Sequence, residues 1–268
     1  MIKVDSYKII SDLEKRHIES LAKRGYRIDG RGFKDYRKIT IETDYVPKAE
    51  GSARVFLGNT QIVAGVKISI GAPYPDTPDA GVITVNAEFS PMAAPHFEAG
   101  PPGEEAVEVA RVVDRGIRHS DIIDKQKLAI IPGEQVFILF VDLYVLGYNG
   151  NMFDAGELAA VKALMNTKLP KYEIVDGEVK LVPEWTLLEI EDYPVSVTIA
   201  KIGNTLVVDP NANEERVLDS RITFALNSRS EIVSVQKGEA GTFTVNEIEQ
   251  AIEMAQEVSP KLREILKA

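Results

Sequence analysis

Apolar and polar residues alternate through much of the first hundred positions, in short runs of the length that β-strands have. Such alternation places every second side chain on one face of a sheet and predicts half-buried strands. Turn residues separate the runs, and we expect these strands to form a mostly antiparallel sheet. The predicted strands are Ile39–Thr43, Gly51–Leu57, Gln61–Ile70 and Val82–Phe89.

Four other segments space their apolar residues three and four positions apart, which is the pattern of an amphipathic helix. The first predicted helix, Val4–Arg24, ends at Gly25, a residue that favours helix termination. Its apolar residues are Ile9, Ile10, Leu13, Ile18 and Leu21. The other predicted helices are Glu104–Arg118, Asp154–Lys168 and Val245–Leu266.

The tripeptide Gly-Asn-Thr occurs twice, at 58–60 and at 203–205, each time between two apolar runs. Turns of this kind join hairpin strands, and each copy is followed by more predicted strand and then helix, which indicates a duplication. The predicted fold class is therefore α+β, with two similar sheet-plus-helix halves packed together and an extra N-terminal helix. The predicted divisions are residues 1–25 for that helix, 26–190 for the first half and 191–268 for the second.

Composition limits the sites that the chain can build. With no cysteine and only three scattered histidines, disulfides, thiolate zinc sites and cysteine nucleophiles are excluded, and no metal site is predicted. No apolar run approaches the roughly 20 residues that cross a bilayer, and the N-terminus lacks a signal peptide, so we expect a cytoplasmic protein without a membrane partner. The formal charge of −10 repels nucleic acid on average, so RNA contact requires a local basic patch or a partner.

The segment Val136–Leu164 reads as a buried strand, a short Gly/Asn loop and the start of a helix. A loop that delivers backbone N–H groups to a helix N-terminus can bind an anion, because unpaired donors and the helix dipole both favour negative charge. The loop Tyr148–Phe153 contains no Arg, Lys, Ser or Thr, so it has the frame of a phosphate site without its side chains. The alternative is an ordinary turn with Asp154 as the helix N-cap.

Three arginines share one face of the predicted helix Glu104–Arg118. Arg111, Arg115 and Arg118 are spaced by four and three residues, and such a stripe could grip successive phosphates of RNA or another anion. The alternative is that basic residues near the helix C-terminus complement the helix dipole and form i, i+4 ion pairs.

An acidic turn follows the apolar run at Leu206–Val208. Its carboxylates could bind Mg²⁺ or act in general acid–base catalysis. Acidic turns after strands also occur simply as solvated loops, and no Ser/His/Asp arrangement, Walker loop or dinucleotide fingerprint accompanies this one. The residues are Asp209, Glu214, Glu215 and Asp219.

Four segments, in order along nearly the whole chain, resemble the ribonuclease PH family. They are RIDGR at 27–31, GSARVFLGNTQIVAGV at 51–66, FEAGPPGEEAVEVARVVDRGIR at 97–118 and DPNANEERVLDSR at 209–221. The N-terminal helix and the PPGEEA loop most closely resemble the larger, non-catalytic ring subunits of archaeal exosomes. The resemblance implies a duplicated α+β fold, in agreement with the repeated Gly-Asn-Thr turns.

Active members of that family phosphorolyse RNA from its 3′ end, and the resemblance implies that several of their site residues are replaced here. Met152 and Phe153 stand where the family has a Thr-Arg pair that holds phosphate. Asn213 matches the first of two aspartates, Asp219 matches the second, and Glu105 matches an arginine. No catalytic residue is therefore predicted in this chain.

The implied role is a non-catalytic subunit in a hexameric ring of three heterodimers with a catalytic ribonuclease PH-like subunit. Inorganic phosphate and Mg²⁺ are then expected at the partner's active site, single-stranded RNA along Arg111, Arg115 and Arg118, and RNA-binding cap proteins on the ring. One alternative is a phosphorolytic ribonuclease that is active alone through Asp219 and neighbouring carboxylates. Another is a scaffold without RNA contact.

Overall fold

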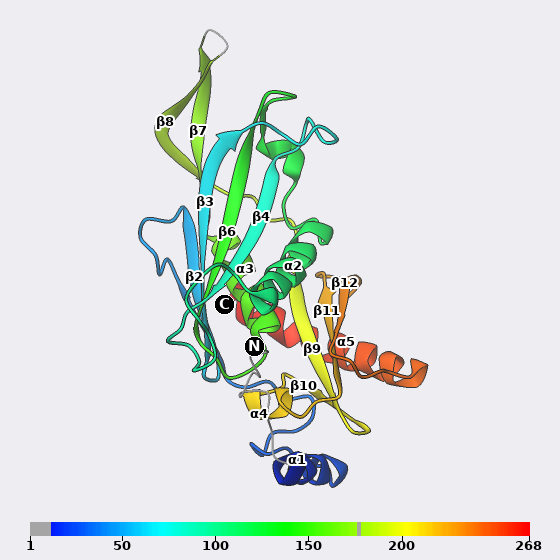
Figure 1. The fold of residues 1–268 in the computed structure, drawn as a ribbon. Coiled ribbons are helices and arrows are strands. Elements are labelled where there is room, and N and C mark those ends of the chain that lie inside the picture. The colour runs from blue at the N-terminus through cyan, green and yellow to red at the C-terminus, as the bar shows by residue number, and fades with distance from the viewer. Residues whose placement is uncertain (1–11, 176–177) are drawn as a thin grey trace.

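The computed structural model describes residues 12–175 and 178–268. It contains two main sheets, with helices between them and on the outer side of the second sheet (Figure 1). The two halves share one large hydrophobic core, whose side chains come from both sheets and from the helices α2 (Glu104–His119), α3 (Met152–Met165) and α5 (Val245–Lys267). The predicted α+β class is confirmed.

The first sheet is antiparallel except at one edge. Its strand order is β1-β2-β3-β6-β4, with β5 also paired to β6, and β4 runs parallel to β6. The strands alternate buried and less buried side chains, because one face packs on helices while the other meets solvent. Their bounds are β1 Ile39–Thr43, β2 Gly51–Leu57, β3 Thr60–Gly71, β4 Val82–Phe89, β5 Ala129–Ile131 and β6 Gln135–Gly147.

The second sheet has the order β10-β9-β11-β12 and is antiparallel throughout. Both Gly-Asn turns close two-residue hairpins, since Leu57 pairs with Thr60 and Ile202 pairs with Thr205. Gly58 and Gly203 both have left-handed φ angles, of 58° and 60°, as such turns require. The strands are β9 Val195–Ile202, β10 Thr205–Val208, β11 Ser220–Leu226 and β12 Ile232–Gly238.

Helix α3, Met152–Met165, lies between the two sheets and is buried over nearly its whole length. It contacts β2 and β3 on one side and β9 on the other, and α2, Glu104–His119, packs beside it against β4 and β12. The sequence pattern predicts helices that cover one sheet face in each half. The structure instead shares α2 and α3 between the halves, which explains why α3 has no polar face.

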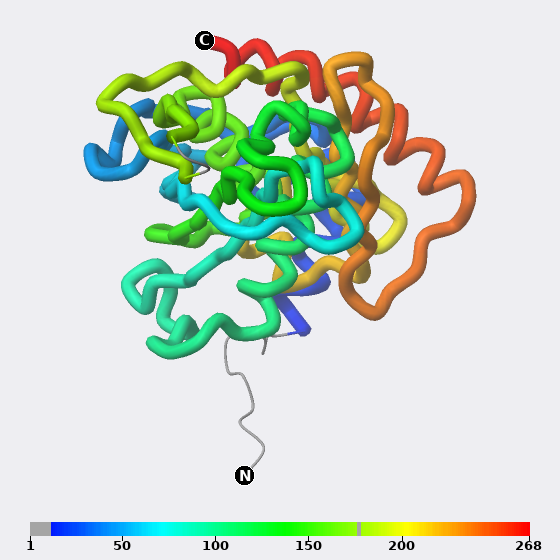
Figure 2. Tube along the Cα trace, turned by 90° about the horizontal axis from the view of Figure 1, so that it is seen from above, coloured from blue at the N-terminus to red at the C-terminus, as the bar shows by residue number. Residues whose placement is uncertain are grey.

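Helix α5, Val245–Lys267, covers the outer face of the second sheet (Figure 2). Ser196 and Thr198 of β9 reach side chains of α3, so the alternate residues of that strand must point the other way, toward α5. The buried residues of α5 recur every three or four positions, as predicted for an amphipathic helix. They are Ala251, Met254, Ala255, Val258, Ser259, Leu262, Arg263 and Leu266.

The predicted N-terminal helix corresponds to α1, Asp12–Lys23, and the first part of that prediction, with Ile9 and Ile10, lies outside the described residues. Ile18 and Ala22 are buried against Val207 and Val217 of the second half, whereas Leu13 is exposed. The N-terminal helix therefore packs on the second half, although the first half follows it in sequence.

The remaining elements are a 3₁₀ helix at Lys125–Leu128, the short helix α4 at Ala212–Glu215, and a separate hairpin of β7 Lys168–Val175 and β8 Glu178–Leu187. The hairpin projects beyond the end of the first sheet in Figure 1. Residues 176 and 177, between β7 and β8 in the sequence, lie outside the described residues.

Candidate functional site

The loop between β6 and α3 brings both halves of the chain together. Asn151 is the N-cap of α3, with a left-handed φ of 55°, and its side-chain oxygen accepts from the Asp154 N–H at 3.4 Å. The prediction that Asp154 caps this helix is therefore wrong. The helix starts two residues earlier than predicted because Asn tolerates the left-handed conformation that this tight turn imposes.

The displaced Asp154 is instead a buried acceptor that joins three segments. Its carboxylate accepts from the Tyr36 hydroxyl at 2.7 Å, from Asn151 Nδ2 at 2.8 Å, and from the backbone and hydroxyl of Thr198 at 3.0 and 2.7 Å. Burial raises the pKa of Asp154 to about 6, although these donors oppose the rise. Asp154 thus connects the N-terminal segment and α3 to β9.

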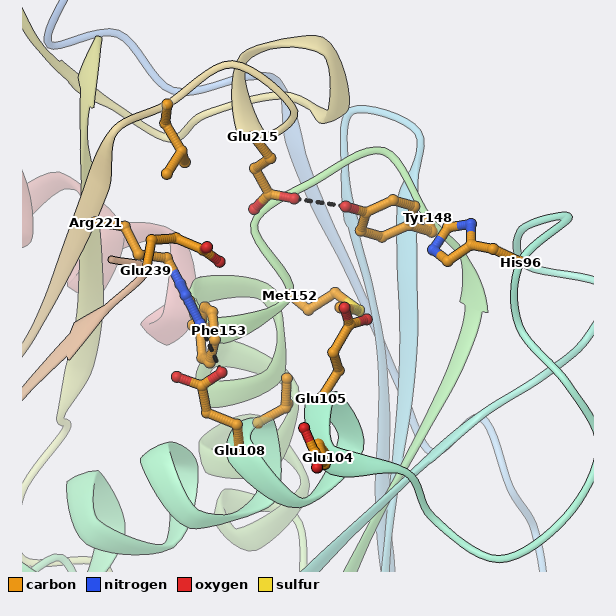
Figure 3. Close-up of a pocket in the computed structure, with 12 residues that line it drawn as sticks. His96, Glu104, Glu105, Glu108, Tyr148, Met152, Phe153, Glu215, Arg221 and Glu239 are labelled. Atoms are coloured by element: carbon orange, nitrogen blue, oxygen red, sulfur yellow. Dashed lines mark hydrogen bonds and ion pairs between the residues drawn. The ribbon is translucent and has the colours of Figure 1, made fainter. Parts of the chain in front are cut away.

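A pocket of about 260 Å³ opens beside the N-terminus of α3 (Figure 3). Met152 and Phe153 line it, so apolar side chains stand where the resemblance leads us to expect a phosphate-holding pair. Five glutamates line the pocket, against a single arginine, and this excess of negative charge disfavours an anionic ligand. The charged lining residues are Glu104, Glu105, Glu108, Glu215, Glu239 and Arg221.

Arg221, the one arginine among the pocket-lining residues, contacts an acidic and an aromatic neighbour. Its Nη2 donates to Glu108 Oε2 at 2.7 Å, and its guanidinium lies over the Phe153 ring, 4.4 Å from the centroid. A side chain on Gly238 would collide with the guanidinium, so the glycine makes room for it. Arg221 therefore closes one wall of the pocket and brings little net positive charge to it.

Glu215, on α4, holds the loop from the opposite side. Its Oε1 accepts from the Asn151 N–H at 2.7 Å and its Oε2 from the Tyr148 hydroxyl at 2.7 Å (Figure 3). Burial raises the pKa of Glu215, while these two donors and the nearby Arg221 and Arg37 lower it. The carboxylate thus sits at the loop that the sequence identifies as the frame of an anion site.

Behind the pocket, three arginines of the segment 27–37 bind the acidic turn of the second half. Asp209 is completely buried and accepts from Arg31 Nη1 at 2.8 Å, from the Arg37 guanidinium at 2.6 and 2.9 Å, and from Asn151 Nδ2 at 2.8 Å. Arg37 also donates to the Asn149 and Gly150 carbonyls. We call Arg27, Arg31, Arg37, Asp209 and Glu214 the interdomain clamp.

The sequence identifies the RIDGR segment at 27–31 and the acidic turn, but not their pairing. The partners in the clamp are up to 187 residues apart, and local patterns carry no information about such pairing. A signal was present, however, because closely spaced arginines before a sheet require acidic partners if they are buried.

The acidic turn does not gather its carboxylates into one site. Glu214 is buried in an ion pair with Arg27, and Asn213 is exposed. Asp219 accepts from the Gly203 N–H at 2.7 Å and lies 3.9 Å from Lys15 Nζ, and it is not part of the pocket lining. Within the described ranges, no group of three or more His, Asp or Glu side chains is arranged to hold a metal ion.

The three arginines of α2 differ in their surroundings. The Arg118 guanidinium donates to both oxygens of Asp114, at 2.9 and 2.7 Å, in an i, i+4 ion pair. Arg115 donates to Gln236 of β12 at 2.6 Å, and Arg111 is exposed, with no ion pair of its guanidinium among the described residues. The Arg118–Asp114 pair is of the kind that the ion-pair interpretation predicts, and RNA contact along this stripe stays a prediction.

Comparison with known proteins identifies the family. Residues 35–170 match domain 1 of the ribonuclease PH, or 3′ exoribonuclease, family, and residues 192–258 match domain 2. The chain belongs to this family. Ribonuclease PH family membership confirms the resemblance seen in the sequence and accounts for the duplicated fold.

Ribonuclease PH family members that are similar over the full length include the exosome complex component Rrp42 of Thermococcus kodakarensis, 47% identical over 97% of both chains. The Rrp42 protein of Methanopyrus kandleri is 46% identical and covers 97% of this chain and 98% of its own. These matches extend over nearly the whole chain.

Solved structures agree in fold. A chain of the Archaeoglobus fulgidus exosome with RNA bound to the active site superposes with a TM-score of 0.88 at 45% identity, covering 94% of this chain and 97% of that one. A chain of an archaeal exosome core gives 0.85 at 42%, covering 96% and 97%. Rice Rrp46, at 18% identity and a TM-score of 0.68, shares the ribonuclease PH fold alone.

Among the described residues, no helix combines the length and apolar character that crossing a bilayer requires.

Proposed function

We propose that this chain is a non-catalytic subunit of an archaeal-type exosome and forms a hexameric ring of three heterodimers with a catalytic ribonuclease PH-like subunit. The observation that carries the proposal is the pocket at the N-terminus of α3, which is lined by Met152, Phe153 and five glutamates. A phosphate there would lose charge-assisted partners and face like charge. The similarity to Rrp42 proteins over the full length supports the same role.

In the ring, this subunit shapes and supports the partner's active site, where inorganic phosphate and Mg²⁺ act in 3′-to-5′ phosphorolysis of RNA. Single-stranded RNA contacts Arg111, Arg115 and Arg118 on the face of α2, mainly through its backbone. Such sequence-independent contacts suit a complex that degrades many RNAs. RNA-binding cap proteins complete the complex, and its place of action is the cytoplasm.

The alternative of a ribonuclease active alone has little support in the arrangement of carboxylates. Asp219 binds the Gly203 turn, Glu214 is neutralised by Arg27, and Glu215 is held by two donors. The second alternative, a scaffold without RNA contact, draws support from the pairing of Arg118 with Asp114.

Assembly with the catalytic subunit of the same organism tests the proposal. We expect the mixture to elute as one species whose mass, measured by light scattering, equals three copies of each chain. Two separate species at micromolar concentration would contradict the proposal, whatever the state of the pocket.

A further inference from the structure

The carboxylate of Glu215 occupies the position at which the loop before α3 would bind an anion. The Asn151 N–H, at the N-cap of a 14-residue helix, points at Glu215 Oε1 from 2.7 Å. We propose that Glu215 is a built-in substitute for a phosphate-sized oxyanion, which occupies the loop donor and so adds to the exclusion of inorganic phosphate from this pocket.

The groups around Glu215 are those of an anion site. The backbone N–H of Asn151 and the hydroxyl of Tyr148 donate to its two oxygens, and the guanidiniums of Arg37 and Arg221 lie near enough to favour its charged form. The positive end of the α3 dipole adds to this field. The loop donor that an anion would use is therefore already occupied by the Glu215 carboxylate.

The chain holds Glu215 in this place by several independent contacts. The Ala212 N–H donates to the Asn149 carbonyl at 3.0 Å, and Asn211 and Glu214 form a reciprocal capping box at the start of α4. Glu214 is in turn fixed by Arg27 at the buried ion pair. A backbone hydrogen bond thus joins the turn that carries Glu215 to the loop, and the ion pair of Glu214 joins the same turn to the interdomain clamp.

Glu215 differs from the other glutamates of the pocket in its contact with the loop before α3. Glu104, Glu105 and Glu108 project from α2 on the opposite wall, and Glu239 follows β12 (Figure 3). They contribute negative charge, whereas the Glu215 carboxylate also accepts the hydrogen bond from the Asn151 N–H of the loop. Removal of Glu215 would leave the Asn151 N–H without this acceptor and would take a carboxylate away from Tyr148, Arg37 and Arg221.

The test compares Glu215→Ala with Glu239→Ala, which removes an equal charge from the same pocket and leaves the loop donor occupied. Phosphate binding to the full-length chain is measured by titration calorimetry, and crystals soaked in tungstate locate a bound oxyanion by anomalous scattering. We expect Glu215→Ala to bind phosphate at least about tenfold more tightly than the unaltered chain. We expect the tungstate to lie within hydrogen-bond distance of the Asn151 N–H.

Equal phosphate affinity of Glu215→Ala and Glu239→Ala, or a tungstate site away from Asn151, would overturn the inference. If the alanine variant does not fold, Glu215→Ser, which keeps a small polar side chain, is tested in the same way and against the same expectation. Because both measurements use the isolated chain, their outcome is independent of whether it joins a ring.

Discussion

Arg27 and Glu214 form an ion pair that is almost completely buried, with side chains only 1% and 2% exposed and Arg27 Nη2 2.5 Å from Glu214 Oε2. The remaining donors of Arg27 reach the Val208 and Asp209 carbonyls at 2.8 Å. One guanidinium therefore donates both to the backbone carbonyls at the end of β10 and to the Glu214 carboxylate of α4. The pair positions the acidic turn against the loop before α3.

Replacement of Arg27 by Ala should destabilise the protein strongly, because it leaves the Glu214 carboxylate buried without a partner. We expect a loss of about 3–5 kcal/mol in the free energy of unfolding, measured by urea denaturation. The matched control is Lys34→Ala, which breaks an exposed ion pair with Glu257 and should change stability by less than about 1 kcal/mol. Similar small losses in both variants would contradict a stabilising role for the clamp.

Gly150→Ala should be far more damaging than Gly203→Ala, although both glycines have left-handed φ angles, of 83° and 60°. A Cβ at Gly203 meets nothing within 4 Å, so only backbone strain of about 1–2 kcal/mol applies there. A Cβ at Gly150 would lie 2.6 Å from the Asn211 carbonyl carbon and 2.7 Å from the Ala212 nitrogen, and would force the loop and the acidic turn apart. We expect a further loss of about 1–3 kcal/mol, measured by thermal unfolding. Equal losses would mean that the close approach of loop and turn is not maintained in solution.

We expect the protonated Glu157 to make the free energy of unfolding decrease as the pH rises. It is fully buried in α3, its Oε2 lies 3.5 Å from Ser196 Oγ, and Asp154 of α3 and Asp114 of α2 add negative charge around it. Burial raises the pKa of Glu157 well above its ordinary value, so the folded protein keeps the proton that the unfolded chain releases. The sign is therefore a loss of stability with rising pH, by up to about 1.4 kcal/mol per unit, until the folded pKa is reached.

Glu157→Gln removes this titration while conserving shape. Because the raised pKa of Asp154, about 6, produces the same trend at lower pH, the comparison is made above pH 6. There the unaltered protein should continue to lose stability in urea titrations, and the Gln variant should lose less. Parallel stability curves above pH 6 would show that Glu157 is not held protonated.

Charge reversal on α2 should weaken RNA binding by the assembled ring. We expect Arg111→Glu combined with Arg115→Glu to lower the affinity for a single-stranded oligoribonucleotide roughly tenfold or more and to reduce its salt dependence, because phosphate contacts release counterions. Fluorescence anisotropy at several salt concentrations measures both quantities. The control is Lys171→Glu combined with Lys180→Glu, an equal charge change on the projecting β7–β8 hairpin. Equal effects of the two pairs would support the scaffold without RNA contact.

Local periodicity predicted much of the fold. The bounds of β1, β2 and β4 agree with the predicted strands, and α2 and α5 begin at the predicted residues and extend one residue further. These elements carry their own signal, since alternation or helical spacing decides which face is buried. The start of α3 was missed because its left-handed Asn151 does the capping that the sequence assigned to Asp154.

The candidate site was only half predictable. Met152, Phe153 and Glu105 were recognised from the family resemblance, and all three line the pocket. The placement of Glu215 on the loop and the burial of Asp209 among arginines depend on contacts between the two halves. Such contacts are set by tertiary packing, which a single sequence does not specify locally.

The central claim is that this chain has no phosphorolytic activity of its own and supports that of a partner. The most direct test is release of nucleoside diphosphates from an oligoribonucleotide, with phosphate and Mg²⁺, by this chain alone, by the catalytic subunit alone and by the assembled ring. We expect no release by this chain alone, and phosphate-dependent release by the ring that exceeds that of the catalytic subunit. Phosphate-dependent release by this chain alone, lost in Asp219→Asn, would contradict it.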